Sequence, residues 1–249
     1  MLHRTEVLRL EQIELALDQV APHPMRAAYC QKSGEWLQDF SHAQRLRPSM
    51  RLSRRQEFTS GRNCASQALK SLGVSMDCSL IPDEDGLPTW PTGYVGSISH
   101  CREQVVAVAA PANALACVGI DIEDVHRLSQ AAADRILSET EMDWVGGSTR
   151  LASLVFSAKE AIYKAYYPHY RRSANFKDVH LTPVENTSCM RLRANTERFS
   201  QRWAQQIEQF TVRYTFIDSY VLCCSYLLKS SSTKSTRNHA VDESADACV

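Results

Sequence analysis

Three acidic residues close an apolar segment near the middle of the chain, which reads "CVGIDIED" over residues 117–124. Successive side chains of a β-strand point to opposite faces, so Asp121 and Glu123 share one face and the isoleucines beside them share the other. Two carboxylates on one face at this spacing suit a hard cation such as Mg²⁺. Charges at strand ends are more often simply solvated. This segment alone leaves both interpretations open.

A second candidate is the helical pattern of residues 151–167, in which the apolar positions form one stripe. Glu160 and Lys164 lie together on the opposite face, and Lys159 lies at the flank of the stripe. At a spacing of four residues, Glu160 and Lys164 could form an ordinary surface ion pair worth roughly a few tenths of a kcal/mol. In the alternative interpretation, Glu160 lines a cleft and completes a carboxylate set with the two acids of the strand.

Arginines begin a third candidate segment, "SRRQEFTSGR", at the start of a predicted helix. Arg55 and Arg62 lie seven residues apart on one helical edge, and Arg54 lies at the helix start. Guanidinium groups bind phosphate in a bidentate manner. Arginines on a helix surface are nevertheless more often solvated, so phosphate binding is one of two readings.

A fourth segment, "GSISHC", covers residues 96–101 and contains the adjacent residues Ser99 and His100. A nucleophilic serine is disfavoured because no G-x-S-x-G motif is present and no third member of a triad is placed. Adjacent residues of a strand also point to opposite faces. A histidine that donates a hydrogen bond to a phosphate is easier to accommodate.

Composition excludes several classes of protein. The 249 residues contain 28 basic and 28 acidic side chains, so no overall field attracts nucleic acid or a membrane surface. Nine cysteines are scattered without a C-x-x-C pair, which favours reduced thiols in the cytoplasm over a disulfide framework. The N-terminus lacks the apolar core of a signal peptide, and the longest apolar run, residues 220–228, is too short to span a bilayer.

Hydrophobic periodicity and turn residues predict a mixture of helices and strands. The predicted helices cover residues 53–72, 128–145 and 151–167, the last ended by Pro168. The predicted strands cover residues 94–100, 104–110 and 115–123, followed by a hairpin of residues 210–217 and 220–228. From Lys229 onward the chain is rich in serine and charge, which predicts a disordered tail.

Four segments, in this order, resemble those of the 4′-phosphopantetheinyl transferases: "RRQEFTSGRNCASQAL", "GLPTWPTGYVGSISH", "VGIDIE" and "FSAKEAIYKA". The resemblance is closest to the branch with the enterobactin- and surfactin-type enzymes and the mycobacterial enzyme. It extends over residues 53–176, about half of the chain, and weakly into the final hairpin. The paired G-I-D-x-E and K-E-A-x-x-K motifs are specific in combination.

The resemblance implies an enzyme of the holo-[acyl-carrier-protein] synthase type. Members of this family transfer the 4′-phosphopantetheine arm of coenzyme A to a serine of an apo acyl or peptidyl carrier protein, and they release 3′,5′-ADP. The expected cofactor is Mg²⁺, with Mn²⁺ as an alternative, and coenzyme A is the co-substrate. The expected partner is the carrier protein, with no nucleic acid and no membrane, and the expected state is a cytoplasmic monomer.

The resemblance also implies roles for individual residues. Asp121, Glu123 and Glu160 would hold Mg²⁺ against the pyrophosphate of coenzyme A, and Glu160 would take the proton of the carrier serine directly or through water. The remaining predicted ligands all contact coenzyme A: Arg54 and Arg62 at the 3′-phosphate, Gly86 and Pro88 of the "DGLP" turn at the adenine, Ser99 and His100 at the phosphates, and Lys159 and Lys164 at the pyrophosphate.

The fold implied by the resemblance is α+β, with two similar α/β halves in a pseudo-dimeric arrangement and coenzyme A between them. The halves would cover residues 1–112 and 113–228, the second with the metal site, and residues 229–249 would form the tail. Two positions depart from the family pattern: Phe156 replaces a frequent tryptophan, and Asp85 replaces a basic residue of some relatives.

Two other functions remain open on the residues alone. A coenzyme A-binding module that has lost transfer would not need the acidic residues and Lys164 intact. A metal-dependent phosphodiesterase would use the same carboxylates with water as the nucleophile, and would cleave coenzyme A without a carrier protein.

Overall fold

The computed structural model describes residues 10–32, 51–75, 80–196 and 200–229. The predicted tail, apart from Lys229, lies outside the described residues. Eight strands of the described segments form two antiparallel sheets, one of order β1-β3-β2 and one of order β4-β8-β7-β6-β5. The strands are β1 (Arg26–Gln31), β2 (Tyr94–Cys101), β3 (Gln104–Pro111), β4 (Leu115–Asp124), β5 (Val179–Pro183), β6 (Cys189–Ala194), β7 (Thr211–Ile217) and β8 (Tyr220–Leu228).

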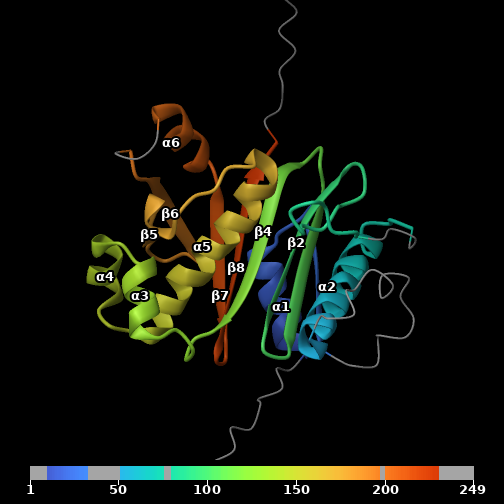
Figure 1. The fold of residues 1–249 in the computed structure, drawn as a ribbon, viewed down its shortest axis with the longest axis horizontal. Coiled ribbons are helices and arrows are strands. Elements are labelled where there is room, and N and C mark those ends of the chain that lie inside the picture. The colour runs from blue at the N-terminus through green and yellow to red at the C-terminus, as the bar shows by residue number, and fades with distance from the viewer. Residues whose placement is uncertain (1–9, 33–50, 76–79, 197–199, 230–249) are drawn as a thin grey trace, which may run out of the picture.

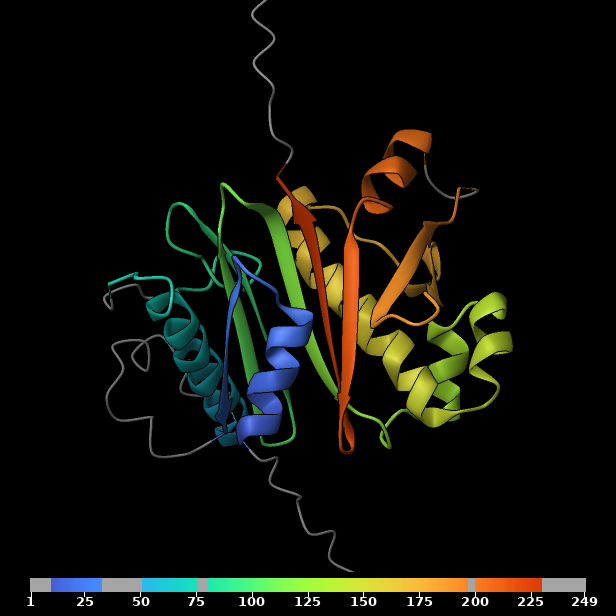
Figure 2. The same ribbon diagram turned by 180° about the vertical axis from the view of Figure 1, so that it is seen from behind.

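The helices are distributed over two sides of these sheets. They are α1 (Leu10–Val20), α2 (Leu52–Lys70), α3 (Gln130–Ile136), α4 (Glu139–Val145), α5 (Thr149–Tyr170) and α6 (Gln201–Ile207), with a 3₁₀ turn, η3 (Phe176–Asp178). Helix α2 packs on the three-stranded sheet and α5 packs on β4 and β8 (Figure 1). Helix α1 lies on the opposite side, in front in Figure 2. The α+β architecture with two α/β halves confirms the predicted fold class.

The two sheets meet where β2 and β4 run side by side at the centre of the molecule (Figure 1). Behind them, Ile120 and Ile122 of β4 are buried in one apolar cluster with Val106 of β3 and Leu17 of α1. The isoleucines therefore face the core, as strand alternation predicts. The opposite face of β4, which carries Asp121, turns toward α5.

Gly119 allows α5 to approach β4 unusually closely. A Cβ atom at this position would overlap the backbone carbonyl oxygen of Ala161 and the backbone nitrogen of Ala165. The helix therefore packs with its backbone directly against the strand. As a result, Glu160 and Lys164 of α5 lie beside Asp121, which follows Gly119 by two residues on β4.

Most predicted elements are confirmed, with shifts of one to three residues at their ends, and two predictions are wrong. The predicted helix over residues 128–145 is two short helices, because Leu137 is extended and ends the first, and Ser138 caps the second in a capping box with Glu141. Pro168 does not end α5, which continues to Tyr170. The disruption that Pro168 causes is confined to the last turn, which Arg171 closes in a left-handed conformation.

Two further expectations concern the whole chain. The seven cysteines within the described segments are all free thiols, which agrees with the predicted absence of a disulfide framework there. None of the helices in the described segments is both long enough and apolar enough to cross a membrane.

Candidate active site

Three polar side chains from three different elements meet between the two sheets. The hydroxyl of Ser99, on β2, donates a hydrogen bond to Oδ1 of Asp121, on β4, at 2.8 Å. The ammonium group of Lys164, on α5, donates to the same Oδ1 atom at 2.6 Å and to Ser99 Oγ at 2.9 Å. Asp121 is only 2% exposed, and its second oxygen, Oδ2, has no hydrogen-bond partner. This buried oxygen can accept a further ligand.

Two half-buried glutamates lie within electrostatic reach of Asp121. Burial, together with the charge of Asp121, raises the pKa of Glu123 to about 7 against an opposing effect of Lys164. Burial and the same aspartate also raise the pKa of Glu160. Carboxylates whose pKa is raised by burial and a neighbouring negative charge are stabilised in the ionised form by a cation placed beside them. The sequence prediction that these three acids lie together is therefore consistent with their electrostatics.

The donor set suits a hard cation, although its side chains are not placed to bind one as they stand. Among the described residues, no three His, Cys, Asp or Glu side chains are close enough together to hold a metal ion. The ammonium of Lys164 instead neutralises Asp121. Oxygen donors, an Asp121 Oδ2 without a hydrogen-bond partner, and the raised pKa values of Glu123 and Glu160 suit binding of Mg²⁺. Metal binding by Asp121, Glu123 and Glu160 stays a prediction.

Without divalent cations, we expect Glu123→Gln to become progressively more stable than the wild type as the pH rises from about 5 to about 8. The pKa of Glu123 in the folded protein, about 7, lies above its ordinary value. The folded state therefore binds this proton more tightly, and stability is lost as the pH rises between the two values. Thermal unfolding in EDTA would measure the difference. A difference in stability that does not change with pH would contradict a raised pKa of Glu123 in the folded protein.

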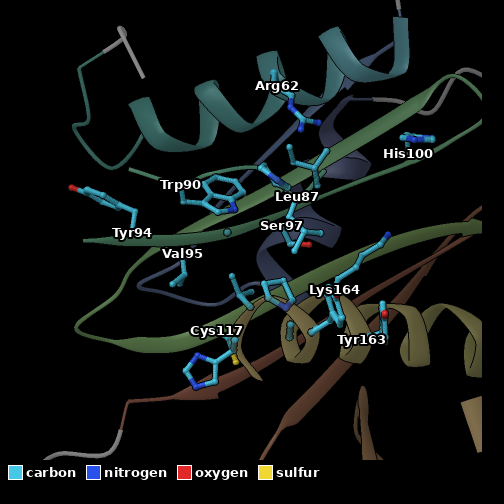
Figure 3. A pocket seen from close by; sticks show the side chains of 18 of the residues that line it. Arg62, Leu87, Trp90, Tyr94, Val95, Ser97, His100, Cys117, Tyr163 and Lys164 are labelled. Atoms are coloured by element: carbon cyan, nitrogen blue, oxygen red, sulfur yellow. The ribbon is translucent and has the colours of Figure 1, made fainter. Parts of the chain in front are cut away.

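A cavity of about 370 Å³ lies beside this cluster, between α2 and α5 and over β2 (Figure 3). Lys164 extends from α5 toward the strands at one side of the cavity, and Arg62 points into it from α2 (Figure 3). The structure brings five of the predicted coenzyme A ligands to its wall, namely Arg54, Arg62, Pro88, His100 and Lys164. Ser99 and Asp121 lie beside Lys164, and Gly86 forms the turn before Pro88 with a positive φ.

The basic groups of this first cavity are held in place by specific contacts. Arg62 donates from Nε to the carbonyl oxygen of Leu80 at 3.3 Å, and its guanidinium lies 3.9 Å from the ring centroid of Phe58. Burial lowers the pKa of Arg62 to about 10, so it remains charged at neutral pH. Arg54 is exposed and pairs with Glu57, which also lies 3.8 Å from His100 Nε2. A phosphate in this region would meet guanidinium and imidazole groups.

Lys159 is the one predicted ligand that the structure directs elsewhere. Its ammonium is almost fully buried and pairs with Glu141 at 2.7 Å. It also donates to the carbonyl oxygens of Ile136 and Phe176, at 3.0 and 2.7 Å. With three oxygen partners, the group has no donor left for a pyrophosphate. The resemblance implied that Lys159 contacts the pyrophosphate, but the packing of α3 and α4 against α5 encloses it instead.

A second cavity, of about 270 Å³, begins where the first ends and was missed by sequence reasoning. It is mostly apolar and is lined by residues that include Glu160, Tyr163, Tyr166, Phe176 and Trp203. Tyr163 lines both cavities, so Glu160 and Lys164 lie on either side of the division between them. The "EAIYKAYY" pattern, with aromatic residues between the two charged groups, was the available signal.

Trp90 was also missed, although its glycine partner is part of the family motif. A Cβ atom at Gly96 of β2 would overlap the Trp90 ring. The glycine thus lets the indole lie flat over the strand, where it lines the first cavity (Figure 3). Tryptophan is a large apolar surface suited to a planar ligand.

Two family models match the chain in succession. Residues 42–110 match the 4′-phosphopantetheinyl transferase N-terminal domain, and residues 117–225 match the 4′-phosphopantetheinyl transferase superfamily. The crystal structure of Helicobacter pylori holo-[acyl-carrier-protein] synthase in complex with coenzyme A aligns with 45% of this chain and 99% of that chain. Its TM-score of 0.37 and 15% identity are too low to support conclusions about the site.

This chain covers different shares of the lengths of its curated relatives. The 4′-phosphopantetheinyl transferases Npt of Nocardia iowensis and PptT of Mycobacterium tuberculosis are 35% and 37% identical over 52% of this chain. The chain spans only 59% and 58% of their lengths. Enterobactin synthase component D of Escherichia coli (strain K12) is 30% identical over 71% of this chain and 82% of the relative. The chain belongs to the 4′-phosphopantetheinyl transferase superfamily.

Proposed function

We propose that this protein transfers the 4′-phosphopantetheine arm of coenzyme A to a serine of an apo acyl or peptidyl carrier protein and releases 3′,5′-ADP in an Mg²⁺-dependent reaction. The observation that carries the proposal is the Ser99–Asp121–Lys164 cluster, in which a buried Asp121 oxygen has no hydrogen-bond partner and Lys164 lines the first cavity. A long ligand with a pyrophosphate near its middle matches this arrangement. Both cavities are mostly apolar, and the first also carries Arg54, Arg62, His100 and Lys164 on its wall.

The nucleotide end of coenzyme A is proposed to occupy the first cavity. Arg54 and Arg62 would bind the 3′-phosphate, since guanidinium groups form charge-assisted hydrogen bonds with phosphate oxygens. The turn with Gly86 and Pro88 would contact the adenine, and His100 would donate to a phosphate. The pantetheine arm would pass Tyr163 into the second cavity.

The pyrophosphate would then lie beside Lys164, Asp121 and Glu160. The residues that would hold Mg²⁺ are Asp121, Glu123 and Glu160, and the bound ion would supply neutralisation of phosphate charge. The raised pKa of Glu160 suits a group that takes the proton of the carrier serine as its oxygen bonds to the phosphorus atom nearest the pantetheine. The bond to the bridging oxygen breaks, and the electron pair leaves with 3′,5′-ADP beside the ammonium of Lys164.

The same proposal includes the state of the protein. Both walls of each cavity come from one chain, so a monomer suffices for the site. The free cysteines of the described segments suit a reducing compartment, and the proposed site of action is the cytoplasm. The proposed division into halves falls near residues 112–113, where the chain passes from β3 to β4.

Incubation with coenzyme A, Mg²⁺ and a set of apo-carrier proteins would test the function. We expect at least one carrier to gain one phosphopantetheine by mass spectrometry, with an equal amount of 3′,5′-ADP, and EDTA to prevent both. Release of 3′,5′-ADP without carrier modification would instead indicate a phosphodiesterase. Binding of coenzyme A with neither product would indicate a binding module.

A further inference from the structure

An arginine from one half of the molecule binds two aspartates of the other half. Arg171 follows the last residue of α5 and donates from Nη2 to Asp83 Oδ2 at 2.7 Å and from Nη1 to Asp85 Oδ2. The two aspartates belong to the turn that precedes β2. We refer to Arg171, Asp83 and Asp85 as the latch.

Asp83 connects the latch to the internal structure of its turn. Its other oxygen, Oδ1, accepts hydrogen bonds from the backbone nitrogens of Asp85 and Leu87, at 3.0 and 2.9 Å. The hydrogen bond from Arg171 is the main reason that the pKa of Asp83 lies below its ordinary value. One carboxylate thus fixes the turn with one oxygen and the far helix with the other.

The latch lies next to residues that line the first cavity. Leu87 and Pro88, which follow the two aspartates, line this cavity, and so do Pro168 and His169, which precede Arg171. Along α5, Arg171 lies seven residues, about 10 Å, beyond Lys164. The latch therefore lies away from the pyrophosphate, at the end where the nucleoside of coenzyme A would be.

We infer that Arg171 is a positioning residue for the nucleotide end of coenzyme A. By holding both aspartates, it keeps the Leu87–Pro88 wall at a set distance from the end of α5. This inference rests on the proposed function. It also gives a role to Asp85, which replaces a basic residue of some relatives: here the positive charge comes from α5 and reaches the turn across the cavity.

Calorimetric titration of 3′,5′-ADP into the full chain would test this role without requiring transfer. Two exposed ion pairs of this kind correspond to a three- to tenfold effect, so Arg171→Ala should weaken binding by about that factor at low ionic strength. The effect should shrink at high ionic strength, because salt screens exposed charges. The KM for coenzyme A should rise by a similar factor, with kcat changed by less than about twofold.

Matched variants separate the latch from a general charge effect. Arg172→Ala removes the same charge one residue further, and Glu84→Gln removes a charge between the two aspartates. Neither should change binding. Asp83→Asn removes the charge but keeps an oxygen for the turn, and combining it with Arg171→Ala should weaken binding no further than Arg171→Ala alone.

The outcomes separate a failure of the latch from a failure of the proposed function. A wild-type protein that binds neither 3′,5′-ADP nor coenzyme A would overturn the proposed function. A wild type that binds, with Arg54→Ala weakened and Arg171→Ala equal to Arg172→Ala, would overturn the latch and leave the function standing. Weakened binding that is additive in the Asp83 and Arg171 double variant would also count against the latch.

Discussion

Asp121→Asn should reduce carrier modification by about a thousandfold or more, because it removes the charge on which metal binding and the position of Lys164 both depend. The substitution keeps the shape of the side chain, and Lys164 is 28% exposed and can turn toward water. The protein should therefore stay folded. Carrier mass gain at saturating coenzyme A and Mg²⁺, with thermal unfolding in parallel, would measure both effects.

Asp124→Asn is a matched control within the same strand. Asp124 lies on the opposite face of β4, where it is buried, pairs with Arg102 at 2.6 Å and accepts from the backbone nitrogen of His126. Removal of its charge should lower the melting temperature but preserve transfer. Near-wild-type transfer by Asp121→Asn would indicate that "CVGIDIED" is an ordinary strand end without a role in transfer, and would refute the mechanism.

Glu160→Gln should lower kcat by about two to four orders of magnitude, the range associated with loss of a general base. Glutamine fills the same space and can still accept hydrogen bonds, but it cannot take the serine proton. Burial and Asp121 already raise the pKa of Glu160, so the neutral amide should be at least as stable in the fold. Single-turnover transfer to an apo-carrier would report the chemical step.

Binding of 3′,5′-ADP provides the control for Glu160→Gln. Glu160 lines the second cavity and not the first, so the affinity for this product should stay within about twofold of the wild type. A variant that lost binding and transfer together would indicate damage to the fold around α5. Transfer at the wild-type rate would exclude Glu160 as the base.

Several elements could be predicted because their information is local. The hairpin of β7 and β8 follows from an alternating strand, a turn at Asp218 and Ser219, and a continuous apolar run that is buried along most of its length, and Asp218 adopts a positive φ. The faces of β4 follow from alternation. In contrast, β5 and β6 are short and β1 has little apolar contrast. The side chains of β5 and β6 do alternate between buried and exposed, but over only five and six residues, which is too short to distinguish a strand from a loop by pattern; pairing with neighbouring strands completes them.

The candidate site divides in the same way. Residue order alone places Asp121 and Glu123 on one face of a strand, and Glu160 and Lys164 on one face of a helix, because backbone geometry sets these periods. Tertiary structure alone decides that Lys164 meets Asp121 while Lys159 is enclosed by Glu141, and that Arg171 crosses to Asp83. The surroundings of each side chain depend on segments distant in the chain. The two lysines lie on different faces of α5, and only the packing of the helix decides which face borders the cavity.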